Sequence, residues 1–177
     1  MIEFMKQSAG KPESQHAALA WFDAVQPAPF GAMGVRVEGD AIAELVFLDP
    51  GTQVRAPSDA LAREACRQIA AFFENPRHAF DLPLKPVGTP FQRRVWSAIA
   101  AVPCGGKRTY GELARDLGSA ARAVGQACGA NAYPLVIPCH RVVSASGLGG
   151  CAHHADAAGF HAGVKRWLLA HETGNFS

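Results

Sequence analysis

The sequence predicts a mixed α/β (α+β) protein: a small N-terminal subdomain of a sheet plus a helix, then a mostly helical C-terminal domain with a helix-turn-helix. Three observations predict this fold class. In residues 33–48, apolar and other side chains alternate as in two strands joined by a glycine turn. Residues 58–74 have apolar side chains at helical spacing. Two helix-capping boxes then follow a proline-rich segment that crosses to the second half of the chain. A chain of 177 residues is long enough for one domain or for two small ones.

A hairpin is predicted near the N-terminus. Residues 33–37 alternate apolar side chains with small or charged ones, which is the period of a strand, and the apolar residues 42–48 form the return strand. Gly39 and Asp40 between them are typical turn residues. The preceding stretch, residues 18–25, fits a helix or a strand equally well.

One helix and a crossing follow the hairpin. In residues 58–74 the apolar side chains share one helical face, and Asn75-Pro76 ends the helix because proline cannot continue it. The next stretch, Leu82–Gly88, is rich in proline and suits a linker. We place the subdomain boundary there, with one unit over residues 1–85 and the other over residues 86–177.

The C-terminal half reads as a series of short helices. Residues 89–92 and 109–112 both begin with a threonine N-cap and have Gln or Glu three positions on, which is the pattern of a capping box. A third helix is predicted over residues 120–129 after a break at Gly118, with Ser119 placed to cap it. Two short helices across a glycine-containing turn indicate a helix-turn-helix, although an ordinary helix pair has the same spacing.

Three further features of the second half are an apolar run, the surface of the third helix and a final helix. The short apolar run at residues 135–137 predicts a buried strand. The surface of the helix over residues 120–129 consists of small side chains with Arg122 as its one large cation, so this helix can approach another surface closely. A final amphipathic helix reaching Glu172 is predicted from residues at helical spacing: Val164, Trp167, Leu168 and His171.

Charge and cysteine content narrow the function class. Residues 1–85 carry 8 Lys and Arg against 11 Asp and Glu, whereas residues 86–177 carry 9 against 4, so the second half is the better candidate for a polyanionic partner. Five cysteines with no paired spacing indicate reduced thiols. No long apolar run or secretory signal is present in the sequence. We therefore expect a cytoplasmic protein that does not span a membrane.

Cys139 followed by His140 is the chemically richest position. A thiolate is a strong nucleophile, and a nearby base lowers the barrier to forming it. Glu172, the last acid in the chain, could orient the imidazole as in cysteine–histidine–acid sites. From these residues alone, a structural and a catalytic role both stay open.

The wider motif resembles a known family. The string from Pro138 to Val143, Pro-Cys-His-Arg-Val-Val, resembles the active-site signature of the O6-alkylguanine-DNA alkyltransferases, also called methylated-DNA–protein-cysteine methyltransferases. Further segments stand in the order of that family, and the resemblance covers residues 88–172: Gly88–Gln92, Val95-Trp96, Thr109–Ala114, Ala121–Gly125, Asn131, Pro134, Ile137 and Lys165–Glu172.

The resemblance implies direct repair of duplex DNA that carries O6-alkylguanine, with O4-alkylthymine left open as a second lesion. The alkyl group would move irreversibly to Cys139, one group per molecule, without a cofactor. His140 would draw off the thiol proton through a bridging water, Glu172 would hold its imidazole, Tyr110 would protonate the departing guanine, and Asn131 would brace the turn at the cysteine.

The same resemblance implies the DNA and pocket contacts. Arg122 would fill the space left by the flipped base, Pro134 would wall the alkyl group, and the Val142 carbonyl would accept from the base. It also implies a ribonuclease-H-like N-terminal subdomain, which favours a strand for residues 18–25, and a monomer. The DNA-binding set contains, besides Arg122, the residues Tyr110, Gln92, Ala121, Ala123 and Gly125.

Three departures from the family pattern concern the site. The turn at residues 117–120 is shorter than in the family, and the loop 151–163 is longer, with Cys151 where the family has an aromatic residue. Phe160 is our candidate replacement in the pocket. The loop also contains metal-ligand types, so zinc capture is a side hypothesis, although we assign no metal: Cys151, His153, His154, Asp156 and His161.

Three alternatives accompany the alkyltransferase interpretation. A lesion binder without transfer would lack the cysteine, so Cys139 argues against it. A cysteine hydrolase needs an oxyanion hole, for which the sequence has no sign. A DNA-binding regulator would show sequence-specific affinity, whereas we expect sequence-tolerant binding that weakens steeply with salt.

Overall fold

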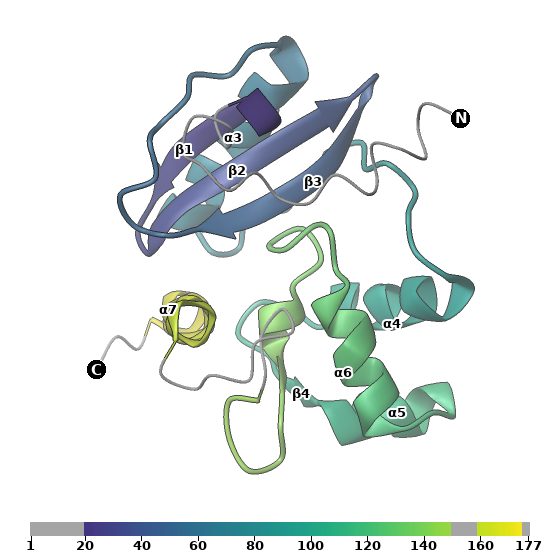
Figure 1. The fold of residues 1–177 in the computed structure, drawn as a ribbon. Coiled ribbons are helices and arrows are strands. Elements are labelled where there is room, and N and C mark those ends of the chain that lie inside the picture. The colour runs from purple at the N-terminus through teal and green to yellow at the C-terminus, as the bar shows by residue number, and fades with distance from the viewer. Residues whose placement is uncertain (1–19, 150–158, 175–177) are drawn as a thin grey trace.

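Three antiparallel strands form the N-terminal sheet in the computed structural model, which describes residues 20–149 and 159–174. They are β1 (Ala24–Ala28), β2 (Gly31–Glu38) and β3 (Ala41–Leu48), in the order β1-β2-β3 (Figure 1). The predicted hairpin is confirmed. The strand expected around Trp21 is wrong at its start, because β1 begins only at Ala24. The Trp21 ring instead packs against the Arg36 guanidinium, whose Cζ atom lies 5.1 Å from the ring centroid.

Helix α3 (Ala60–Glu74) packs on this sheet, as the helical pattern of residues 58–74 predicted. Asp59 caps it by accepting a hydrogen bond from the backbone N–H of Ala62. The proline-rich crossing then pairs with the start of β3, since the Ile42 backbone N–H donates to the Pro83 carbonyl at 2.7 Å and its carbonyl accepts from Lys85 at 2.8 Å. The crossing is therefore fixed to the sheet along this stretch.

The C-terminal half begins with α4 (Pro90–Ala100), α5 (Tyr110–Leu117) and α6 (Ala121–Gly129). Both predicted capping boxes are present, at the starts of α4 and α5. The prediction that Ser119 caps α6 is wrong: Ala120 is the N-cap and makes no side-chain bond. The Ser119 backbone N–H instead donates to Ala114 and closes α5, whose C-cap Gly118 has a φ of 64°.

The segment after α6 is a turn, so the strand expected at residues 135–137 is wrong. The Ile137 backbone N–H donates to the Tyr133 carbonyl at 2.8 Å, and Leu135 has a φ of 75°, which a strand does not allow. The run is apolar because it fills a core: Leu135 is 3% exposed and packs among residues of the sheet and α3. Pattern alone does not distinguish a buried turn from a buried strand.

The chain then forms the 3₁₀ helix η1 (Cys139–Arg141), strand β5 (Val142–Val143) and helix α7 (Phe160–Thr173). Strand β5 pairs in parallel with β4 (Arg108–Thr109). Figure 1 shows α7 end-on, below the sheet and to the left of the helical half. Val164 and Leu168 of α7 join the core of the sheet and α3, while a second core lies among α4, α5 and α6.

The division at residues 85 and 86 stays a prediction. What the structure adds is that α7 and the turn after α6 complete the N-terminal core, although both come from the second half of the sequence. Among residues 20–149 and 159–174, no helix has the length and apolar character needed to cross a membrane.

Candidate active site and nucleic-acid interface

Cys139 begins the 3₁₀ helix η1, directly after Pro138. Asn131 braces the turn in front of it: its side-chain amide donates to the Ile137 carbonyl at 2.8 Å and its oxygen accepts from the Tyr133 backbone at 2.9 Å. The Asn131 side chain also hydrogen-bonds Cys139. The structure thus brings Asn131 to the turn that precedes the cysteine.

Burial raises the pKa of the Cys139 thiol. The bond from Asn131, the nearby Lys165 ammonium and two backbone N–H groups act in the opposite direction without cancelling the effect of burial. At neutral pH the resting group is therefore a thiol. A base must remove its proton before the sulfur can act as a strong nucleophile.

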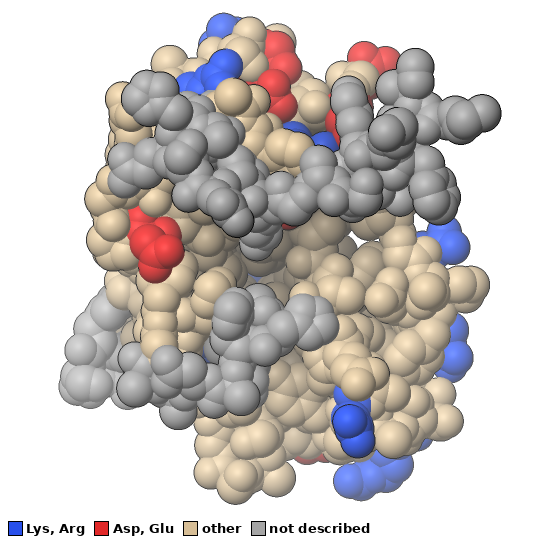
Figure 2. All heavy atoms as spheres, in the orientation of Figure 1, with Lys and Arg blue, Asp and Glu red and all other residues tan. Residues whose placement is uncertain are grey.

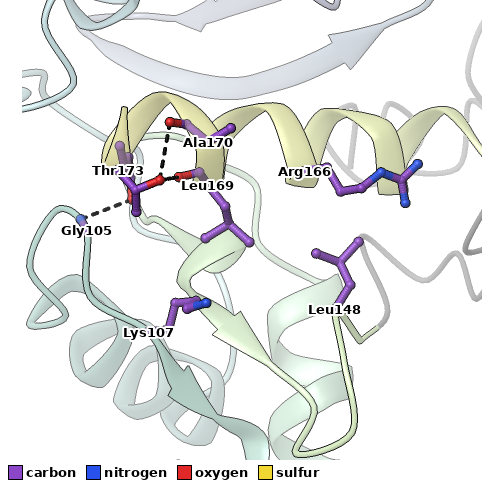
Figure 3. A pocket seen from close by; sticks show the side chains of 8 residues that line it. Gly105, Lys107, Leu148, Arg166, Leu169, Ala170 and Thr173 are labelled. Carbon is purple, nitrogen blue, oxygen red and sulfur yellow. Dashed lines mark hydrogen bonds between the residues drawn. The ribbon is translucent and has the colours of Figure 1, made fainter. Parts of the chain in front are cut away.

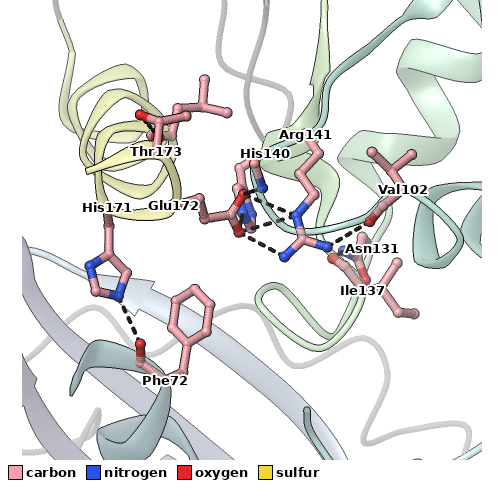
Figure 4. A network of polar contacts seen from close by, with 11 residues as sticks. Phe72, Val102, Asn131, Ile137, His140, Arg141, His171, Glu172 and Thr173 are labelled. Atoms are coloured by element: carbon pink, nitrogen blue, oxygen red, sulfur yellow. Dashed lines mark hydrogen bonds and ion pairs between the residues drawn. The ribbon is translucent and has the colours of Figure 1, made fainter. Parts of the chain in front are cut away.

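His140 and Glu172 form a buried pair next to this thiol (Figure 4). The His140 Nε2 atom lies 2.6 Å from Oε1 of Glu172, and the two side chains are 4% and 0% exposed. Arg141 binds the same carboxylate with Nε at 3.0 Å from Oε2 and Nη2 at 2.8 Å from Oε1, while its Nη1 donates to the Val102 carbonyl at 2.7 Å. The carboxylate is fixed from two sides.

The protonation states follow from this geometry. Burial raises the pKa of the Glu172 carboxyl, but the hydrogen bonds from His140 and Arg141 outweigh burial and bring this pKa to about 2. Burial lowers the pKa of His140, so its imidazole is neutral at pH 7. An ionised carboxylate only accepts hydrogen bonds, which places the imidazole proton on Nε2. Nδ1 of His140 is therefore the basic nitrogen.

Tyr110 reaches the site through the short β4–β5 pairing. Arg108 and Thr109 pair with Val142 and Val143, so the first residue of α5 starts beside the strand that follows η1. The Tyr110 ring packs closely against Gly149, because a Cβ atom at that position would come within 2.8 Å of the ring. Gly149 also has a φ of 79°, which other residues rarely adopt. Glycine is required at that position.

Lys165 of α7 orients the Tyr110 hydroxyl. Its ammonium is buried and lies 3.4 Å from the Tyr110 oxygen. Lysine has donors and no acceptor, so the phenol oxygen accepts this bond and keeps its own O–H to donate elsewhere. The arrangement suits Tyr110 as a proton donor.

Helix α6 carries four of the six residues predicted to contact DNA, while Tyr110 begins α5 and Gln92 lies in α4. Arg122 and Ala121 are exposed at its start, and Ala123 and Gly125 are half-buried. The turn before it is held by Arg94 of α4, whose guanidinium donates to the Leu117 carbonyl at 3.2 Å. Figure 2 shows Lys and Arg along the lower right of the molecule, over the region of α4 to α6 in Figure 1.

Gln92 has a structural role in addition to its predicted one. Its side-chain oxygen accepts from the Thr89 backbone N–H at 2.9 Å and completes the capping box of α4. The predicted contact with DNA stays a prediction.

The predicted pocket residues separate into two groups. Pro134 and Val142 are both buried, and Val142 belongs to the core cluster against which Cys139 packs. Phe160 packs against the core of the sheet and α3, and its ring meets His161 at 5.2 Å. Its assignment to the alkyl pocket stays a prediction.

A cavity of about 300 Å³ opens on another side of α7 (Figure 3). Lys107 and Arg166 line it together with Leu148 and Leu169. Glu172 is the member of the predicted catalytic set that borders it, and its side chain is fully covered. Cys139 does not line this cavity, so the cavity does not hold the sulfur.

The zinc hypothesis falls mostly outside the described residues. Cys151, His153, His154 and Asp156 are not among them, and His161 lies in α7. Within residues 20–149 and 159–174, no three metal-ligand side chains come together.

Sequence reasoning missed the roles of two cations, Arg141 and Lys165. Arg141 lies inside the six-residue motif, and its signal is chemical: a buried carboxylate beside a neutral imidazole requires a positive charge to balance it. Lys165 occupies the apolar face of α7 between Val164 and Leu168, and a lysine at such a position is a signal of a buried polar partner.

The site combines a cysteine with a neighbouring histidine that can act as its base, and it lies beside a helix pair whose second helix has small surface side chains. These features define the class of protein: a cysteine nucleophile on a helical nucleic-acid-binding unit. The family described as "6-O-methylguanine DNA methyltransferase, DNA binding domain" matches residues 90–174. The methylated-DNA–protein-cysteine methyltransferase of Methanosarcina acetivorans is 35% identical over 154 residues, which cover 82% of this chain and 94% of the relative. The chain belongs to the methylated-DNA–protein-cysteine methyltransferase family.

Solved structures agree with this membership. The O6-methylguanine methyltransferase of Mycobacterium tuberculosis superposes with a TM-score of 0.71 at 34% identity, covering 86% of this chain and 93% of that one. A structure of Mycobacterium tuberculosis OGT in complex with DNA gives a TM-score of 0.69 at 35% identity, covering 85% and 92%. The mixed α/β fold with a small antiparallel sheet is thus that of the family.

Proposed function

We propose that the protein repairs DNA by moving the alkyl group of O6-alkylguanine irreversibly to Cys139, one group per molecule. The observation that carries the proposal is the half-buried Cys139 thiol followed by the neutral His140, whose Nε2 proton is held by Glu172 at 2.6 Å. Relatives at 35% and 36% identity over most of their length carry the name of this activity.

The reaction follows from the protonation states. His140 Nδ1 takes the thiol proton through a bridging water, and the sulfur attacks the alkyl carbon in line with the departing O6 atom. The S–C bond forms as the C–O6 bond breaks, and the bonding electrons pass to the guanine. Tyr110 donates its proton to the base, and the proton on His140 then restores the phenol. In sum, the thiol proton ends on guanine.

The small-residue surface of α6 and the net positive charge of the second half of the chain favour DNA as the partner. Small residues let α6 approach the minor groove, and the exposed Arg122 can enter the stack in place of the extruded guanine. O4-alkylthymine as a second lesion, the monomeric state and action in the cytoplasm remain predictions.

Intact mass spectrometry tests the proposal directly. Reduced protein is mixed with an excess of a duplex that carries one O6-methylguanine. We expect a gain of one methylene per molecule, mapped to the peptide that contains Cys139. Folded protein whose mass does not change with the methyl lesion or with bulkier O6-alkyl lesions would contradict the proposal, and repeated turnover of an ester would indicate a hydrolase instead.

The pH dependence of single-turnover transfer gives a second test. Because burial lowers the pKa of His140 and raises that of Cys139, the neutral imidazole and the thiol coexist over the whole neutral range. We expect a flat rate there and a fall on the acid side, below His140's ordinary pKa of 6.5, where the base becomes protonated. In H140Q the rate should instead rise about tenfold per pH unit, as free thiolate forms. A tenfold slope in the wild-type protein would show that His140 is not the base.

A further inference from the structure

His171 joins the last turn of α7 to the end of α3. Its Nε2 atom lies 2.7 Å from the Phe72 backbone carbonyl (Figure 4). A carbonyl oxygen only accepts hydrogen bonds, so Nε2 carries the proton and donates it. This bond links a helix of the second half of the sequence to the N-terminal half, one residue before Glu172.

The sequence explains why the Phe72 carbonyl needs this donor. In a continuing helix it would accept from the backbone N–H four residues on, but that residue is Pro76, which has no N–H. The carbonyl belongs to the last turn of α3, and Phe72 is 1% exposed. A buried carbonyl without a partner is costly, and His171 provides the missing bond.

The His171 ring is also held by its neighbours. It stacks on Trp167, with centroids 4.7 Å apart and planes 22° apart, and meets the Phe72 ring edge-on at 5.4 Å. Trp167 in turn contacts Phe73 of α3 at 5.8 Å and Phe30 of the β1–β2 turn at 5.9 Å. The end of α7 is thus fixed to both elements of the N-terminal half.

We propose that His171 is a positioning residue for alkyl transfer: through its bond to the Phe72 carbonyl it sets where Glu172 stands against His140. The Glu172 carboxylate is fully covered, and its oxygen lies only 2.6 Å from His140 Nε2. A small shift of the last turn of α7 therefore lengthens or misaligns this hydrogen bond. The inference rests on the proposed function and names the part of the N-terminal half that serves it.

Two variants separate the hydrogen bond from the ring. H171F keeps an aromatic ring against Trp167 but has no donor, whereas H171Q keeps an N–H that can reach the carbonyl. H78F is the matched control, since His78 is another histidine beside a phenylalanine, Phe80 at 5.5 Å, and its buried Nε2 bonds none of the residues described. Transfer rates at saturating damaged duplex and duplex affinity are measured for each.

We expect H171F to transfer the methyl group about tenfold or more slowly with unchanged duplex affinity, H171Q to recover most of the rate, and H78F to match the wild-type protein. The pH readout is specific to positioning. The hydrogen bond that His140 donates to Glu172 raises the pKa of His140, against burial and the charges of Arg141 and Lys165. Weakening that bond in H171F therefore moves the acid limb, the fall of the rate at acid pH, to lower pH. A general loss of structure would lower the rate at every pH and leave the limb in place.

A wild-type rate and limb in folded H171F would overturn the proposal, as would a lowered rate with an unmoved limb. If H171F does not fold, H171N replaces it, because its amide is too short to reach the carbonyl. An NMR titration of the His140 imidazole in wild-type and variant protein needs no substrate. It tests the positioning of His140 even if the wild-type protein transfers no alkyl group, in which case only the proposed function fails.

Discussion

Replacing Cys139 by alanine is expected to abolish alkyl transfer completely while leaving binding to the damaged duplex at the wild-type level. The sulfur forms the new bond to carbon, and alanine has no atom that can do so. The residues predicted to contact DNA lie on α4, α5 and α6, outside η1, so their contacts do not need the thiol. After incubation with O6-methylguanine duplex, C139A should show no mass gain by intact mass spectrometry and an unchanged dissociation constant by fluorescence anisotropy.

Cys104 gives the matched control for this substitution. It is also a half-buried free cysteine, outside η1, and burial raises its pKa too. We expect C104A to gain one methylene at the wild-type rate. A mass gain in C139A would show that another side chain is the acceptor, and a loss of duplex binding in C139A would mean that the cysteine helps to build the DNA interface.

The second large effect is expected at Glu172. In E172Q an amide of the same shape replaces the carboxylate, so His140 loses its charged partner and the largely covered Arg141 loses its counter-charge. The single-turnover rate should fall about 10²- to 10⁴-fold, the range typical of an impaired general base. Breaking a buried ion pair costs about 3–5 kcal/mol, so the melting temperature should fall by roughly 10 °C.

The stability difference should itself depend on pH. The folded pKa of Glu172 is about 2, below its ordinary value of 4.5, so its charge stabilises the fold fully above pH 4.5 and less as the pH falls toward 2. Denaturant unfolding of wild-type protein and E172Q should therefore converge at acid pH. E44Q, which changes an Arg-paired glutamate of β3 with partial exposure, should keep the wild-type rate. A wild-type rate in E172Q would remove Glu172 from the mechanism.

The sequence by itself determined where the helices lie and how α4 and α5 begin, although it misplaced the cap of α6. Thr89 with Gln92 and Thr109 with Glu112 are capping boxes whose partners stand three residues apart, so nothing beyond the local chain is needed to form them. The same holds for the apolar face of α3 and for the six-residue motif around Cys139. Periodicity and short motifs are local, which is why they can be found in one sequence.

The tertiary structure decided which distant groups meet. Lys165 and Tyr110 are 55 residues apart and His171 and Phe72 are 99 apart, and neither pairing was expected. The pairing of His140 with Glu172, 32 residues apart, was expected only from the family resemblance. The run at residues 135–137 failed as a strand for the same reason, because Leu135 adopts a left-handed turn to fill a core built mainly by the other half of the chain. Contacts of this kind depend on how α7 packs between the two halves, and burial then sets the charges of the site. No local pattern contains that information.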